Sequence, residues 1–166
     1  MQQTYQQVMY FEGGDFLILK LVGTLRFDCA FVLEQALEHL KNTKEDHDII
    51  IDMTDTKYID STIIGTIAKS FLPEQGKENL WPLPKIVFEH DDVKKVFDKI
   101  GFDKFFNFQK SDARINIPLE SFTKIENSAQ DKEKLRSTVY SAHQALNVLQ
   151  PHDEDIKIVV QSLKDK

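Results

Sequence analysis

The pattern of apolar and polar residues changes its period several times along the first two thirds of the chain. Short apolar runs rich in β-branched residues, typical of strands, alternate with stretches whose apolar residues recur at helical spacing. The strand candidates lie at about 5–11, 15–23, 47–53, 84–89 and 105–109. The helix candidates lie at about 28–42, 61–72 and 91–100. This order predicts an α/β sandwich, in which helices pack against a mixed sheet and are joined to it by right-handed crossovers.

Two of the strand candidates carry signs of burial. In "DFLILKLVG" (15–23) apolar side chains fall on both faces of the strand, so we expect both faces to be covered. "HDIIIDM" (47–53) is a short run of isoleucines between polar residues, which is typical of a central strand. The centre of the sheet is therefore expected at these two segments.

The pattern changes again from about residue 111 onward. In "AQDKEKLRSTVYSAHQALNVLQ" the apolar positions are spaced by four and three residues in turn, which indicates a helix that packs along another helix. These positions are Leu135, Val139, Ala142, Leu146 and Leu149. Pro151 ends this helix, and 152–166 reads as a second, shorter helix, although "IKIVV" is also compatible with a strand. We therefore divide the chain into a domain at 1–115 and a C-terminal helical extension at 116–166, which either docks back onto the domain or dimerises.

Composition narrows the classes of partner and compartment. The 166 residues carry a formal net charge of −6 and no basic run, so we expect no direct contact with nucleic acid. The single cysteine, Cys29, cannot form an internal disulfide and lies on the apolar face of the first predicted helix. No apolar run is long enough to span a membrane, and the N-terminus does not resemble a signal peptide. We expect a cytoplasmic protein that is a monomer or a weak homodimer.

Motifs for catalysis, cofactors and metals are missing from the sequence. The five histidines lack metal-ligand spacing, and no glycine-rich phosphate loop, dinucleotide fingerprint or nucleophile elbow occurs. Asp52 or Asp55 near a strand end, with Lys85 beside a later strand, would suit a phosphorylated receiver domain. That class also needs an acidic pair after its first core strand to hold a divalent cation, and "LKLVGTLRF" contains no acid. We therefore expect neither enzymatic activity, nor a cofactor, nor a metal.

The segment "KYIDSTIIG" (57–65) places Asp60, Ser61 and Thr62 where a loop turns into a helix. Helix capping alone explains such residues, because their oxygens accept the unpaired N–H groups of the first turn. The same position also tolerates a phosphoryl group on a hydroxyl, since the start of a helix favours negative charge. The residues by themselves leave both roles open.

With its flanking strand, this segment resembles the signature of STAS domains, in particular of bacterial anti-sigma-factor antagonists. The matching features are the apolar strand 49–53, then Tyr58 and Ile59, then Asp-Ser-Thr at 60–62, and Gly65. "GTLRF" (23–27) resembles the Gly-x-Leu turn of the family, and "DVKKVFDKIGFDKFF" (92–106) its penultimate helix and closing strand. The resemblance covers residues 8–115. It implies a STAS-like fold for the domain.

The resemblance also implies a function. In that family the hydroxyl at the position of Ser61 is phosphorylated by a partner kinase, which is often also the anti-sigma factor, and a phosphatase removes the group. The partners implied are a serine kinase of the ATP-binding, histidine-kinase-like type and a serine phosphatase. The unmodified domain would occupy the kinase and free a sigma factor for transcription. A scaffold of the same fold that binds a signalling or transport complex without regulated phosphorylation is the alternative.

Particular residues take roles from this resemblance. Ser61 is the expected phosphorylation site, with Thr62 as the fallback acceptor. The expected partner interface around it consists of Tyr58, Ile59, Asp60, Thr62, Ile63 and Gly65. Many family members have a small residue at the position of Ile63, so this side chain is expected to affect the geometry of the loop and the choice of kinase.

Overall fold

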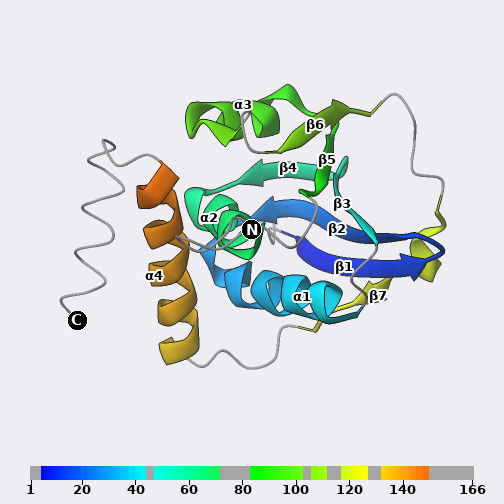
Figure 1. Cartoon of the computed structure of the whole chain (residues 1–166), viewed down its shortest axis with the longest axis horizontal. Coiled ribbons are helices and arrows are strands. Elements are labelled where there is room, and N and C mark those ends of the chain that lie inside the picture. The colour runs from blue at the N-terminus through cyan, green and yellow to red at the C-terminus, as the bar shows by residue number, and fades with distance from the viewer. Residues whose placement is uncertain are drawn as a thin grey trace.

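The chain folds into an α/β sandwich built on a mixed sheet, which confirms the fold class predicted from the sequence (Figure 1). The computed structural model describes residues 5–43, 47–71, 83–102, 106–111, 117–126 and 132–149. The strands are β1 (Gln6–Gly13), β2 (Phe16–Leu25), β3 (Asp48–Met53), β4 (Thr56–Ile59), β5 (Lys85–Phe88), β6 (Asn107–Lys110) and β7 (Thr123–Lys124). The helices are α1 (Ala30–Thr43), α2 (Ser61–Phe71), α3 (Asp91–Lys99) and α4 (Lys132–Leu149), with short 3₁₀ turns η1 (Phe27–Cys29) and η3 (Leu119–Ser121).

The sheet has the strand order β6-β5-β3-β2-β1-β7, and β4 also pairs with β2. β1 and β2 form an antiparallel hairpin, whereas β3 and β4 run parallel to β2, and β5 and β6 continue the parallel part. The steps from β2 to β3, β5 and β6 all move in one direction across the sheet. Right-handed crossovers with this order place α1, α2 and α3 on the same face.

The main core lies between that face and the helices. Its members include apolar residues from alternate positions of β2 and β3 together with residues of all four α-helices. Representative side chains, each with essentially no exposed area, are Leu19, Leu37, Ile51, Ile67, Phe97 and Leu146. On the opposite face of the sheet Met9 and Ile18 are also buried, as expected for a strand with apolar groups on both sides.

Strand β4 was not predicted from the sequence. After β3 ends at Met53, the chain turns through Thr54 and Asp55 and pairs again with the far end of β2. The register of this pairing shifts between Gly23 and Thr24. Gly23 has φ +90°, and a Cβ there would lie 1.8 Å from the carbonyl oxygen of Tyr5, so only glycine fits. "GTLRF", expected as a turn after the strand, thus begins inside β2.

Described residues of the 117–126 and 132–149 segments join the same sheet and core. β7 pairs with β1, and Ile125 packs against the core cluster. The predicted C-terminal helix is present as α4, which lies alongside α2 (Figure 1). Ala142 and Leu146 of α4 are completely buried in this contact. The second helix expected at 152–166 lies outside the described residues.

Candidate functional site

Asp60 joins the starts of two helices. Its Oδ1 accepts a hydrogen bond from the backbone N–H of Ile63 at 3.1 Å, which is the geometry of a helix N-cap for α2. Its Oδ2 accepts a hydrogen bond from the backbone N–H of Phe27 at 2.7 Å, at the beginning of η1. Asp60 therefore fixes the loop before Ser61 against the end of β2.

Ser61 is the first residue of α2, half-buried, and its side chain contacts α4. Its Oγ lies 3.3 Å from Nε2 of His143, a residue with only 5% of its surface exposed. Nδ1 of His143 lies 2.9 Å from the carbonyl oxygen of Val139. Because a carbonyl oxygen only accepts, Nδ1 carries a proton, and in the tautomer with its one proton on Nδ1 the other nitrogen, Nε2, accepts from the Ser61 hydroxyl. The expected phosphorylation site is thus hydrogen-bonded to the C-terminal helix.

The other residues expected around the phosphorylation site differ in exposure. The Tyr58 side chain is exposed, with 47% of the residue's surface accessible, and Asp60 is half-buried. The remaining four, Ile59, Thr62, Ile63 and Gly65, are all buried. The hydroxyl of Ser61 is therefore more accessible than that of Thr62, and the bulk of Ile63 is accommodated in the core.

α2 and α4 approach each other closely at Gly65. A Cβ built on Gly65 would lie 2.3 Å from the carbonyl oxygen of Ala142 and 2.7 Å from its carbonyl carbon. These are backbone atoms, which cannot move aside as a flexible side chain can. The two helices pack as they do because residue 65 is glycine.

Polar contacts with α1 complete the attachment of α4. The hydroxyl of Thr138 donates to Oε2 of Glu34 at 2.8 Å, and Lys69 of α2 forms an ion pair with the other oxygen of Glu34. The Glu34 carboxylate thereby connects three helices. Lys41 of α1 also donates to the carbonyl oxygen of Ser70 at the end of α2.

A groove of about 440 Å³ opens beside Ser61, between α4 and the start of α2. Asp60, Thr62 and His143 line it next to Ser61. Two basic side chains of α4, Lys132 and Arg136, also line it. Apolar residues supply the rest of its walls: Phe27, Leu135 and Val139.

Two exposed aromatic residues, Phe27 and Tyr58, are connected to Asp60, the first by a hydrogen bond and the second by its position in the sequence. Phe27, whose N–H bonds to Asp60, is 52% exposed, and Tyr58 precedes Asp60 by two positions. The guanidinium of Arg26 stacks over the Tyr58 ring, 5.5 Å from its centroid. Aromatic residues and arginine are enriched in protein interfaces, so this is a suitable surface for a protein partner.

The carboxylates near the end of β3 serve a structural network. Oδ2 of the buried Asp52 lies 3.1 Å from Nζ of Lys20, and Oδ1 accepts from the N–H and the hydroxyl of Thr54. Lys20 also pairs with Asp55 at 2.8 Å. Burial alone lowers the pKa of Lys20, but the hydrogen bonds and charges of Asp55 and Asp52 outweigh it and raise this pKa above its ordinary value.

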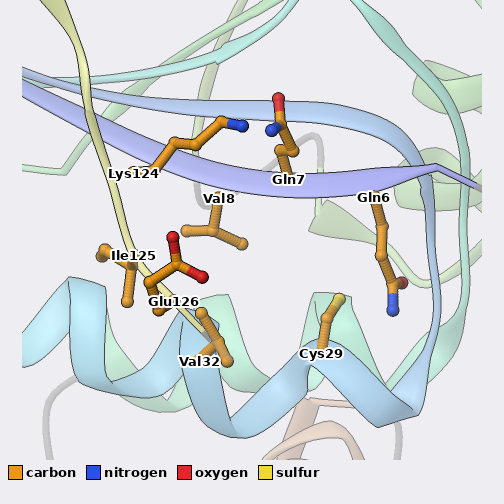
Figure 2. A pocket seen from close by; sticks show the side chains of 8 residues that line it. All are labelled: Gln6, Gln7, Val8, Cys29, Val32, Lys124, Ile125 and Glu126. Carbon is orange, nitrogen blue, oxygen red and sulfur yellow. The ribbon is translucent and has the colours of Figure 1, made fainter. Parts of the chain in front are cut away.

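A second hollow, of about 200 Å³, lies between β1 and the start of α1 (Figure 2). Val8, Cys29 and Val32 face one another across it, while Gln7 points to the opposite side of β1. The Cys29 thiol donates to the carbonyl oxygen of Arg26 at 3.1 Å. Burial, with smaller effects of nearby charges, raises the pKa of this thiol to about 12. Cys29 is thus a buried apolar residue, as its position in the sequence predicts, and its thiol stays protonated at neutral pH.

This thiol gives the stability a pH dependence. The pKa of the Cys29 thiol is about 12 in the folded protein, and its ordinary value, which applies to the unfolded chain, is 9.0. Between these two pH values the unfolded chain loses a proton that the folded chain keeps. Stability therefore falls as pH rises through this window. From about pH 8 to about pH 10 we expect an additional loss of about 1.4 kcal/mol in the wild type relative to Cys29→Ala, measured by urea unfolding. Equal losses in the two proteins would contradict this assignment.

Sequence reasoning missed two residues of the site, His143 and Phe27. His143 directly follows Ala142, one of the apolar positions predicted to face another helix, but its contact with Ser61 joins residues that are 82 positions apart in the sequence. The exposure of Phe27 has no signal in the sequence.

Within the described ranges, no group of three or more histidine, cysteine, aspartate or glutamate residues is arranged to hold a metal ion. The same part of the chain contains no helix with the length and apolar character required to cross a membrane. A scan of the sequence against protein-family models found no match, and a search of curated proteins found none either.

Proposed function

We propose that this chain is a STAS-like anti-sigma-factor antagonist that acts in the cytoplasm by partner switching. Its unmodified form binds a kinase that is also an anti-sigma factor, and so frees a sigma factor for transcription. Phosphorylation of Ser61 ends that binding. The protein itself is not an enzyme in this scheme, and its partners carry out both covalent steps.

The covalent cycle is simple. The kinase transfers the γ-phosphoryl group of ATP to Oγ of Ser61, which forms one O–P bond, breaks the bond to the β-phosphate and releases ADP and the hydroxyl proton. The phosphatase cleaves the Ser61 ester with water and releases inorganic phosphate. Both steps take place at a hydroxyl that belongs to the first turn of α2.

The placement of Asp60 and Ser61 is the observation that carries this proposal. Asp60 makes both hydrogen bonds that shape the helix start, to Phe27 and to Ile63, so the Ser61 hydroxyl is not needed for capping. The Ser61 side chain instead points toward α4, where its Oγ lies 3.3 Å from Nε2 of His143. The exposed rings of Phe27 and Tyr58 near Asp60 offer a surface for the partner.

Mass spectrometry tests the covalent step directly. The chain is incubated with ATP and each ATP-binding serine kinase encoded in its own genome, and its intact mass is measured. Addition of one phosphate to the wild type but not to Ser61→Ala is the expected result. No modification by any of these kinases, or equal modification of Ser61→Ala, would overturn the proposal.

Binding to the kinase gives a second expected result. Ser61→Asp adds part of the charge of a phosphate, and we expect it to weaken the complex at least about tenfold, or about 1.4 kcal/mol. Ser61→Ala is expected to bind like the wild type, because it adds neither charge nor bulk. A calorimetric titration measures the three affinities, and equal values would argue against an electrostatic switch.

A scaffold without regulated phosphorylation is the second candidate, and one observation favours it. Ser61 is half-buried and hydrogen-bonded to His143 of α4, so a kinase does not reach it without a displacement of that helix. In this case a partner would bind the chain while Ser61 stays unmodified. The mass measurement above, combined with a pull-down from a lysate of the same organism, separates the two candidates.

A further inference from the structure

The side chain of Ser61 lies in the contact between α2 and α4. Its Oγ is 3.3 Å from Nε2 of His143, a buried residue of α4. The backbones of the two helices also approach each other closely at Gly65 and Ala142. A group added to the Ser61 hydroxyl therefore has to share this contact with α4 or displace the helix.

We propose that docking of α4 and phosphorylation of Ser61 exclude each other, so that α4 is an autoinhibitory helix which the phosphate releases from α2. This inference rests on the proposed function, because it assumes that Ser61 becomes phosphorylated, and it concerns the regulation of that same site. The linkage is reciprocal: the docked helix opposes the phosphorylated state by the same free energy by which the phosphate opposes docking. The unmodified and the modified protein then differ in whether α4 covers the start of α2.

The space between Ser61 and His143 does not admit a phosphate. Oγ and Nε2 lie within hydrogen-bond distance of each other, which leaves no room between them for a phosphorus atom and its oxygens. In the tautomer of His143 with its one proton on Nδ1, Nε2 also presents a lone pair, and the phosphate oxygens are acceptors as well. A phosphate that points where the hydroxyl now points therefore separates α4 from α2.

A phosphate that turns away from His143 also weakens the docking of α4. Nε2 then loses the Ser61 hydroxyl as its donor, although His143 is only 5% exposed while α4 is docked. A buried acceptor without a donor destabilises the arrangement that buries it. Both orientations of the phosphate thus favour the state in which α4 has left α2.

The groove beside Ser61 offers an added anion little stabilisation. Much of its wall is apolar, and Asp60, the residue before Ser61, contributes a carboxylate to it. Lys132 also lines the groove but precedes His143 by eleven residues, which is about three turns or about 16 Å along α4. Arg136 precedes His143 by about two turns and already interacts with another group. Among the described residues, the groups next to Ser61 therefore favour release of α4 over a new contact with it.

The start of α2 itself tolerates the phosphate, so the cost falls on α4. Negative charge is favourable at the beginning of a helix, and the first turn is held by the two backbone hydrogen bonds of Asp60, which do not involve the Ser61 hydroxyl. Release of α4 uncovers Ala142 and Leu146, which are completely buried while it is docked. It also opens the phosphoester to a phosphatase.

The test needs no kinase. Phosphoserine is incorporated at position 61 of the full chain by amber suppression, and hydrogen exchange of the backbone amides is followed by mass spectrometry. We expect the α4 amides to exchange at least about tenfold faster than in the unmodified chain, while the β3 amides keep their protection. Unchanged or slower exchange of α4, or an equal acceleration in β3, would overturn the proposal.

Two matched proteins separate the phosphate at position 61 from other effects. Phosphoserine in place of Ser121 adds the same charge at an exposed position of η3, next to β7 and not to α4, and should leave α4 exchange unchanged (Figure 1). Ser61→Ala removes the bond to His143 without added charge or bulk, and we expect it to accelerate α4 exchange less than the phosphate does. An equal acceleration of α4 in either of these proteins would also overturn the proposal.

A failure here is distinguishable from a failure of the proposed function. If the protein with phosphoserine at position 61 releases the kinase while α4 exchanges as before, the release of α4 is wrong and partner switching stands. If α4 exchange accelerates as expected but no kinase modifies Ser61, docking and phosphate exclude each other as inferred, and the proposed function is wrong.

Discussion

Replacing Lys20 by alanine is expected to lower the free energy of unfolding by about 3–5 kcal/mol. Asp52 is only 3% exposed, and its Oδ2 is paired with the Lys20 ammonium at 3.1 Å. Removal of the lysine leaves a buried carboxylate whose charge is no longer compensated. Loss of one partner of a buried ion pair is among the most destabilising of single changes. Urea unfolding followed by circular dichroism measures the loss.

An exposed lysine on the neighbouring strand gives the matched control. Lys57→Ala in β4 removes the same side chain from an exposed position and is expected to change stability by no more than about 0.5 kcal/mol. Comparable effects of the two substitutions would show that the Lys20 pair does not stabilise the fold. A double-mutant cycle with Asp52→Ala then isolates the interaction itself.

The ion pairs of Lys20 also affect the segment that leads to Ser61, the proposed phosphorylation site. Lys20 reaches Asp55, whose carbonyl oxygen accepts the N–H of Gly23 in β2 at 2.9 Å. These contacts hold the turn between β3 and β4, and β4 leads directly to Asp60 and Ser61. We therefore expect Lys20→Ala to loosen the start of α2 as well, which hydrogen exchange of the α2 amides would detect.

The alternation of strands and helices could be predicted from the sequence because it depends on local periodicity. The isoleucines of β3 and the helical spacing in α1 and α3 each determine one element without reference to the others. Two short strands, β4 and β7, were not predicted from local periodicity. β4 has buried residues at its two ends, Thr56 and Ile59, with two exposed residues between them, and this is not the alternation of a strand. β7 is only two residues long, and both are exposed.

The candidate site was predictable only in its local part. Capping by Asp60 follows from the residue type and from the helix that begins after it. The contact with His143 does not, because the spacing of the apolar positions in α4 does not specify which helix α4 packs against. That choice depends on tertiary packing, and above all on the absence of a side chain at Gly65.

Substitution of Gly65 by valine is the most direct way to release α4. Any Cβ at this position meets the Ala142 carbonyl group at 2.3 Å, and valine adds two methyl groups to that clash. We expect a loss of about 3 kcal/mol in the free energy of unfolding, at the upper end of the usual cost of overpacking. We also expect rapid hydrogen exchange of the α4 amides, because Ala142 and Leu146 lose their buried contacts.

Whether Gly65→Ala raises or lowers the free energy of unfolding shows which effect is larger at this position, helix propensity or the packing of α2 against α4. Alanine in place of glycine within a helix stabilises by about 1 kcal/mol when nothing opposes it. Against α4, the same substitution is expected to destabilise, and less than Gly65→Val does. A more stable Gly65→Ala protein with α4 still protected would show that α2 and α4 are not in close contact. Destabilisation with exposed α4 amides would show that the backbone at Gly65 holds this helix over Ser61.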